Sequence, residues 1–303
     1  MSAAAERGGS SSPDPLQPMS LLEHVKSAAS LLFITANLLF WAGPLFVLGL
    51  VKLFVPGLRD GSERAMAAIY RVAVRVDDWW LRAVIGIRWS PPDLGLDPER
   101  SYLVLSNHVS WSDILLIQSV IVGEGPLLKF LVKRELVWIP ILGLIFWAFD
   151  FPVLRRRSRS GGDDDERRRR DLEALVEASR AVLQHPAAIV NFAEGTRWTE
   201  AKRVASKSPY RHLLSPRVGG FRTLIEALGP EVDALIDLTL VYPRNISFWA
   251  FLAGRAPKIG IVASKLDARS VPTTRKEASE WLAERWSQKD ATIEHRRAAL
   301  RRA

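Results

Sequence analysis

The sequence predicts an α/β fold: a central, mostly parallel or mixed sheet flanked by helices, with an N-terminal apolar helical membrane anchor. Short apolar runs at 102–106, 187–192 and 234–242 have the length and composition of buried strands. Helical patterns lie between them, and such alternation is typical of a sheet covered by helices. The anchor is predicted because no charged residue occurs from Ser27 to Val51, whereas about 20 apolar residues suffice to cross a bilayer core.

The N-terminal part of the chain divides into a tail, an anchor and an amphipathic helix. Residues 1–19 are rich in Ser, Gly, Pro and Ala, and we expect them to be disordered. Within the anchor, 20–60, Gly43-Pro44 interrupts the apolar stretch, which predicts either one kinked spanning helix or two shorter helices in a re-entrant hairpin. A buried core helix is the third alternative. Residues 62–88 indicate an amphipathic helix running into a strand near 85–87, either on the membrane surface or packed on the domain.

The rest of the chain continues the alternation of strands and helices. The expected elements are a helix at 113–121, a strand near 128–132, a core or membrane-dipping helix at 137–149, a strand at 151–154, a helix at 168–184, a polar loop at 199–217, a helix at 219–228, a strand at 258–263 and a long charged helix from Thr274. This pattern assigns 61–270 to one main domain and 271–303 to a C-terminal charged helix.

The composition favours a membrane partner. The chain has 42 Lys and Arg against 33 Asp and Glu, a net charge of +9, and a basic chain binds nucleic acid, an acidic membrane surface or phosphorylated substrates. The 11 Trp residues favour the membrane surface, because Trp is enriched at the headgroup level. No nucleic acid is expected, since the Arg-rich stretch 155–170 has no interleaved aromatics. The chain has no Cys, so disulfides and thiolate metal sites are excluded, and the five scattered His residues predict no metal cluster.

Two loops that follow buried strands carry the candidate chemistry. In the first, a tight turn can bring the carboxylate of Asp113 to one imidazole nitrogen of His108 and leave the other free to act as a base. In the second, Arg197 offers a planar guanidinium suited to phosphate, and Gly195 lets the backbone approach a ligand closely. Its other polar members are Glu194 and Thr196. Loops at the carboxyl ends of strands gather in α/β sheets, so we expect the two loops to face each other.

Together the two loops resemble the signatures of the glycerolipid acyltransferase family, which is typified by 1-acylglycerol-3-phosphate acyltransferases. The first signature, N-H-x-x-x-x-D, is met by Asn107, His108 and Asp113. The third, F-P-E-G-T-R, is met by Phe192 to Arg197, with Ala193 in place of Pro.

Further segments carry the same resemblance. The second family block is similar to Phe151–Arg155, and the fourth to Leu240–Pro243. Lys133–Leu136, Ile139-Pro140 and the stretch after Glu194 resemble the branch that includes lysocardiolipin acyltransferases. The resemblance covers roughly 85–265 and makes 61–270 an acyltransferase domain.

The resemblance implies transfer of a fatty acyl group from acyl-CoA or acyl-carrier protein to the free hydroxyl of a lysophospholipid, with 1-acylglycerol-3-phosphate as the leading acceptor. His108 would be the general base, oriented by Asp113. Arg197, with Lys133 and Arg155, would hold the acceptor's phosphate. Glu194 would order its loop by hydrogen bonding and by pairing with Arg, beside Gly195 and Thr196. No cofactor or metal is implied, and the oxyanion-stabilising groups are not identified.

Several alternatives stay open at the level of sequence. The acceptor could be a lysophosphatidylglycerol or a lysocardiolipin, the chain could be a non-catalytic membrane adaptor on the same fold, or the dyad could activate water in a hydrolase. The uncharged stretch Ser27–Val51 is followed by Lys52, Arg59 and Arg64 and preceded by Lys26, and this slight excess favours a cytoplasmic body. The expected location is a bacterial inner membrane with the active site on its cytoplasmic side. The oligomeric state is not predicted.

Overall fold

The structure is a computed structural model that describes residues 17–130, 132–133, 137–138, 140–149, 151, 153–154, 176 and 185–302. Three expectations therefore lie largely or wholly outside the described residues. They are the disordered tail 1–19, the Arg-rich stretch 155–170 and the helix 168–184.

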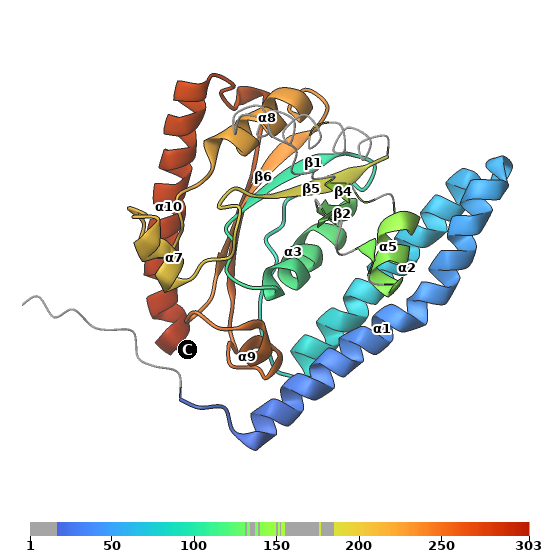
Figure 1. The fold of residues 1–303 in the computed structure, drawn as a ribbon, viewed down its shortest axis with the longest axis horizontal. Coiled ribbons are helices and arrows are strands. Elements are labelled where there is room, and N and C mark those ends of the chain that lie inside the picture. Colours follow the sequence, from blue (N-terminus) through green and yellow to red (C-terminus); the bar gives the residue numbers. More distant parts are fainter. Residues whose placement is uncertain are drawn as a thin grey trace, which may run out of the picture.

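A five-stranded sheet forms the centre of the molecule, with strand order β2-β5-β1-β6-β7 (Figure 1). The strands are β1 (Tyr102–Ser106), β2 (Leu127–Phe130), β5 (Ala187–Phe192), β6 (Ala234–Val241) and β7 (Gly260–Leu266). The first four run parallel, and β7 pairs antiparallel at the edge. The predicted α/β class with a mostly parallel sheet is thus confirmed.

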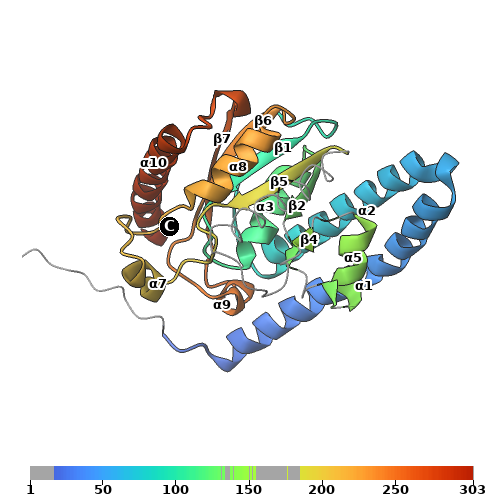
Figure 2. The same ribbon diagram turned by 45° about the horizontal axis from the view of Figure 1, so that its top comes forward.

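Helices cover both faces of the sheet because its central strands are apolar on both sides. Along β1, Tyr102 and Val104 pack with α3 (Ser112–Val122) in one core cluster. Leu103 and Leu105 point the other way, toward α8 (Val218–Leu228) and the C-terminal helix α10 (Arg275–Arg302). This period of two is the geometry of a strand buried on both faces. Figure 2 shows α8 and α10 together on one side and α3 on the other.

The N-terminal region is a long helical hairpin. Helix α1 runs without interruption from Leu21 to Phe54, with Pro44 inside it. A 3₁₀ turn, η1 (Pro56–Leu58), leads into α2 (Arg59–Trp79), which packs along α1 and ends in a π-helical turn, η2 (Trp80–Val84). The expected alternative of two helices separated at Gly43-Pro44 is therefore wrong, and the chain reverses at Pro56–Leu58 instead. The expected strand at 85–87 is wrong too, since only an isolated bridge joins Arg88 to Lys258.

The start of α1 is fixed to the domain by hydrogen bonds. The hydroxyl groups of Ser27 and Ser30 donate to the carbonyl oxygens of Trp249 and Leu252, at 2.8 and 3.0 Å, in the short helix α9 (Phe248–Leu252). Glu23 pairs with Arg255 at 2.7 Å. Beyond this attachment α1 exposes a row of large apolar side chains: Leu31, Leu32, Leu39, Phe40, Phe46, Val47, Leu53 and Phe54.

Among the described helices, α1 is the one long and apolar enough to cross a membrane, with a mean hydropathy of 2.0 and 6% of its most apolar stretch buried. The third alternative, in which the apolar stretch Ser27–Val51 forms a buried core helix, is therefore wrong. Helix α5 (Pro140–Ala148) lies against α1, where the Trp147 indole fills the space over Gly49: a Cβ on that glycine would lie 2.6 Å from the ring.

Smaller elements complete the fold. Strands β3 (Val132–Lys133) and β4 (Val153–Leu154) pair parallel in a separate two-stranded sheet. Helix α7 (Glu200–Ala205) lies within the stretch 199–217 that was expected to be a loop. The sequence did not predict α9 or the 3₁₀ turn η3 (Ala268–Ser270).

Candidate active site

The two candidate loops meet at the carboxyl edge of the sheet, as the sequence predicts. The strand register places Ser106, the last residue of β1, beside Phe192 of β5 and Leu238 of β6. The buried side chain of Asn107 then binds β6, since its amide donates to the Leu240 carbonyl at 3.1 Å and its oxygen accepts from the Leu240 N–H at 2.9 Å. The first loop therefore starts from a fixed point on the central strands.

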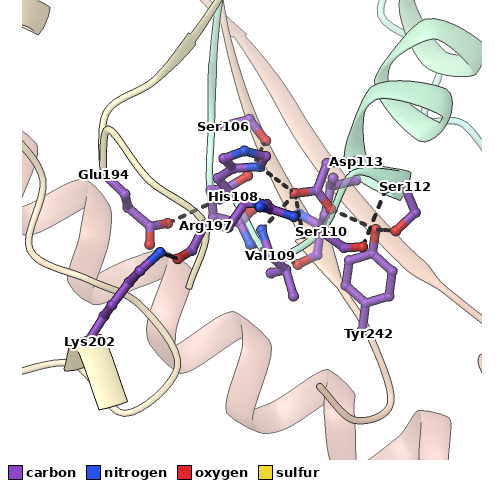
Figure 3. A network of polar contacts seen from close by, with 12 residues as sticks. Ser106, His108, Val109, Ser110, Ser112, Asp113, Glu194, Arg197, Lys202 and Tyr242 are labelled. Carbon is purple, nitrogen blue, oxygen red and sulfur yellow. Dashed lines mark hydrogen bonds and ion pairs between the residues drawn. The ribbon is translucent and has the colours of Figure 1, made fainter. Parts of the chain in front are cut away.

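His108 and Asp113 form a hydrogen-bonded pair, with 2.8 Å between Nδ1 and Oδ2 (Figure 3). Asp113 is fully buried at the start of α3, and the same Oδ2 accepts hydrogen bonds from the backbone N–H groups of Val109 at 2.6 Å and Ser110 at 2.9 Å. An ionised carboxylate can only accept, so it selects the His108 tautomer that carries its proton on Nδ1. The other ring nitrogen, Nε2, is then the basic one.

The His108 ring packs against a neighbouring aromatic ring and stays partly exposed. It stacks on Phe192 with 4.0 Å between ring centroids, and its side chain is 16% exposed. Nε2 has no hydrogen-bond partner among the described residues. Its lone pair is therefore free to accept a proton from a bound hydroxyl group.

Glu194 connects the second loop to the first. Its buried carboxylate accepts from the backbone N–H of His108 at 3.1 Å and from that of Leu214 at 3.0 Å. Burial raises the pKa of Glu194 to about 8, although the two backbone donors and Lys289 act in the opposite direction. The expected pairing with Arg is not found among the described residues. Glu194 orders the backbone through hydrogen bonds instead.

Arg197 is exposed beside the first loop. Its guanidinium lies 5.2 Å from the ring centroid of Trp111, so a cation–π contact holds it there. The backbone N–H of Trp198 donates to the His108 carbonyl at 2.7 Å, which joins the loops a second time. Lys202 stabilises the turn that contains Thr196 and Arg197. Its Nζ donates to the Thr196 hydroxyl at 2.7 Å and to the Arg197 carbonyl at 3.0 Å.

Position 195 requires glycine, because of both the backbone conformation and the neighbouring side chain. Its φ of 67° lies in the left-handed region, which favours glycine. A Cβ there would also lie 2.9 Å from Nε of Arg217. The backbone N–H of Arg217 donates to the carbonyl of Ala193, the residue that replaces Pro in the signature, at 2.7 Å. A second arginine thus flanks the turn that carries Arg197.

A cavity of about 350 Å³ opens between these loops and the start of α9. It is lined by Val109, Ser110, Arg197, Trp198, Asn245 and Phe248, among others. The indole N–H of Trp198 is buried without a partner among the described residues, so it is available as a donor. Within the described part of the chain, no three His, Asp or Glu side chains gather as a metal site would require.

The two remaining predicted site residues are not brought to the loops by any described contact. Lys133 lies in β3, where its backbone pairs with Leu154, and its side chain is outside the described residues. Arg155 is outside the described residues altogether. Their roles stay predictions.

Sequence reasoning missed the role of Tyr242, which immediately follows β6. Its hydroxyl donates to Oδ1 of Asp113 at 2.6 Å (Figure 3). The signal was available, because Tyr242 directly follows a buried strand, as Asn107 and Ala193 do, and residues that follow parallel strands gather at one edge of the sheet.

Comparison with known proteins agrees with this geometry. A family model described as Acyltransferase matches residues 91–247, just over half of the chain and both candidate loops. The chain belongs to this acyltransferase family. The predicted resemblance to glycerolipid acyltransferases is thereby confirmed.

Relatives of the acyltransferase share about a quarter of its residues. It is 27% identical to mouse 1-acyl-sn-glycerol-3-phosphate acyltransferase gamma over 178 residues, which cover 55% of this chain and 45% of the mouse protein. It is 25% identical to zebrafish lysocardiolipin acyltransferase 1 over 283 residues, or 87% of this chain and 69% of that protein. The chain thus spans about half the length of some of the curated relatives it matches.

The crystal structure of the 1-acyl-sn-glycerophosphate (LPA) acyltransferase PlsC from Thermotoga maritima has the same fold. The TM-score is 0.54 at 16% sequence identity, with 89% of this chain and 98% of that chain covered.

Proposed function

We propose that this acyltransferase moves a fatty acyl group from acyl-CoA or acyl-carrier protein to the free hydroxyl of a lysophospholipid, 1-acylglycerol-3-phosphate being the first acceptor to test. The observation that carries the proposal is a His108 with its Nδ1 bound to a buried carboxylate and its Nε2 free, beside an exposed arginine. The names of the relatives supply the substrate class.

The reaction requires one base and no covalent enzyme intermediate. His108 Nε2 accepts the proton of the acceptor hydroxyl as its oxygen attacks the thioester carbonyl carbon. The tetrahedral intermediate collapses, the C–S bond breaks, and the imidazolium returns the proton to the leaving sulfur. The products are an ester and a free thiol. Asp113 stabilises the imidazolium, and a positioned base of this kind contributes about 10²–10⁴-fold.

Arg197 is proposed to bind the acceptor's phosphate. A guanidinium binds phosphate oxygens in a bidentate manner, and this one is exposed at the cavity beside the first loop. Thr196 and Gly195 shape the turn, and Lys133 and Arg155 are proposed as further cationic contacts.

Membrane attachment is proposed through α1. The hairpin presents its apolar row away from the domain, where Figure 1 shows α1 and α2 extending beyond the sheet. Helix α1 could span the membrane, or the hairpin of α1 and α2 could re-enter one leaflet. In either arrangement, we propose that the active site lies on the cytoplasmic side of a bacterial inner membrane.

A panel of acceptors tests the proposal. Purified protein in detergent receives an acyl thioester with lysophosphatidate, lysophosphatidylglycerol or monolysocardiolipin, while thiol release and the lipid product are measured. The proposal predicts thiol release matched by a diacyl product, fastest with lysophosphatidate. Faster turnover of monolysocardiolipin would support the second acceptor, which the long alignment with the zebrafish relative favours. Thiol release without lipid product would indicate a hydrolase, and no turnover a non-catalytic adaptor.

A further inference from the structure

A chain of hydroxyl groups reaches Asp113 from the side opposite His108. Tyr242 donates to Oδ1 of Asp113 at 2.6 Å, and its own oxygen lies 2.9 Å from the hydroxyl oxygen of Ser112. The single phenolic hydrogen is used on Asp113, so Ser112 must be the donor to Tyr242. We call the path Ser112–Tyr242–Asp113 the hydroxyl chain. All three side chains are buried.

The hydroxyl chain supplies the hydrogen bond to the second carboxylate oxygen of Asp113. Oδ2 of Asp113 accepts three hydrogen bonds, from His108, Val109 and Ser110, whereas Tyr242 is the sole donor to Oδ1 among the described residues. Burial and the negative charge of Asp113 hold the pKa of Tyr242 well above its ordinary value. The phenol therefore remains a donor throughout the working pH range.

We propose that Tyr242 is a positioning residue that sets the basicity of His108 through Asp113. A donor on Oδ1 turns Oδ2 toward Nδ1 and withdraws negative charge from that oxygen. Without this donor, the carboxylate charge concentrates on Oδ2 and stabilises the protonated imidazolium more strongly. His108 would then stay protonated to higher pH. This inference rests on the proposed role of His108 as general base.

Other charged groups around the dyad come from different elements and remain in place when the Tyr242 hydroxyl is removed. The charge of Asp113 helps to raise the pKa of Glu194, after β5, and Lys289 of α10 acts in the opposite direction. Arg197 lies beside Trp111 on the outer side of the loop. On α10, Arg297 donates to the Tyr242 carbonyl at 3.0 Å and fixes the backbone that carries the phenol.

The test compares Tyr242→Phe with Tyr210→Phe. Tyr210 is a second buried tyrosine, and its hydroxyl donates to the Ala283 carbonyl at 3.3 Å, away from the dyad. We expect Tyr242→Phe to lower kcat about tenfold, the loss of one hydrogen bond to a charged group, with the acceptor KM unchanged. We expect the acidic limb of the kcat/KM profile to move up by about one pH unit, equivalent to about a tenfold change. Tyr210→Phe should leave both unchanged.

A second variant and a second readout keep the test independent of turnover. Ser112→Ala leaves the phenol of Tyr242 in place but removes the hydroxyl group that donates to it. The acidic limb of the kcat/KM profile should therefore also move to higher pH, by a smaller amount than in Tyr242→Phe. An NMR titration of the His108 ring should show the same order of midpoints: wild type, Ser112→Ala, Tyr242→Phe. Equal midpoints in the three folded proteins, or a shift to lower pH, would overturn the inference. The proposed function would survive that outcome as long as His108→Ala abolishes turnover.

Discussion

Glu194 illustrates at the residue scale how a signature residue can connect two loops through backbone hydrogen bonds. Its two carboxylate oxygens each accept one backbone N–H, from His108 in the first loop and Leu214 in a later one. The loop that carries His108 and the loop that carries Arg197 are therefore connected by this buried side chain. Sequence alone predicted its importance, but not that its partners are backbone groups, because those depend on residues 86 and 20 positions away.

Glu194→Gln should loosen both loops. The amide can accept only one of the two backbone hydrogen bonds and turns its NH₂ group against the other N–H, which costs about 1–3 kcal/mol. Burial raises the pKa of Glu194 to about 8, so its stabilising contribution is complete below its ordinary value of 4.5 and is lost as pH rises through 8. The loss of stability caused by the Gln substitution, measured by thermal unfolding, should therefore become smaller as pH rises from about 4.5 to about 8. A difference that widens with pH would contradict this assignment.

At the scale of elements, the hairpin of α1 and α2 depends on a buried polar contact. The side-chain amide of Asn37 in α1 donates to Oδ1 of Asp77 and to the Ala73 carbonyl in α2, both at 2.9 Å. Trp41 in turn donates to Asn37 at 3.0 Å. These bonds fix the register of two helices whose remaining contacts are mostly apolar.

Asp77→Asn should stabilise the hairpin at neutral pH. Burial raises the pKa of Asp77 to about 7, and the nearby Asp78 adds to this effect. The contribution of Asp77 to stability is thus complete below its ordinary value of 3.8 and is lost as pH rises through 7. Asn keeps an oxygen acceptor for Asn37 and does not ionise. Its gain in unfolding free energy over wild type, measured in detergent, should grow by about 3 kcal/mol from pH 4.5 to 7.5. A gain that is constant across this range would refute the argument.

The elements that sequence predicted best are those with the strongest local pattern. Strands β1, β5 and β6 and helices α3 and α8 fall within two residues of their expected positions, because their apolar runs determine burial directly. Of the two expectations for the anchor, the single helix through Gly43-Pro44 is the one that forms. A reversal at Gly43-Pro44 is also compatible with the sequence, because proline can end a helix, but the chain reverses at Pro56–Leu58. Helices α7 and α9 were missed because they are 6 and 5 residues long, too short for a periodic pattern to appear.

For the whole molecule, the important arrangement is that the apolar helix α1 and the candidate active site both contact α9. Helix α1 starts on α9, whose first residue Phe248 lines the cavity. The candidate site could be predicted from sequence as two loops at one sheet edge, because the residues within each motif are close in sequence and each motif follows a buried strand. The hydrogen bond of Tyr242 joins it to Asp113 across 129 positions of chain, so sequence could indicate only that Tyr242 follows a buried strand at the same sheet edge, and not which group it contacts.

The proposed role of His108 as the base for acyl transfer can be measured as thiol release with lysophosphatidate as acceptor. Wild type and His108→Ala are compared at equal concentration with the same acyl thioester, and thermal unfolding confirms that both are folded. We expect His108→Ala to lower kcat by at least about 10²-fold, while lysophosphatidate still binds through Arg197. Undiminished thiol release and phosphatidic acid formation by the folded variant would contradict it.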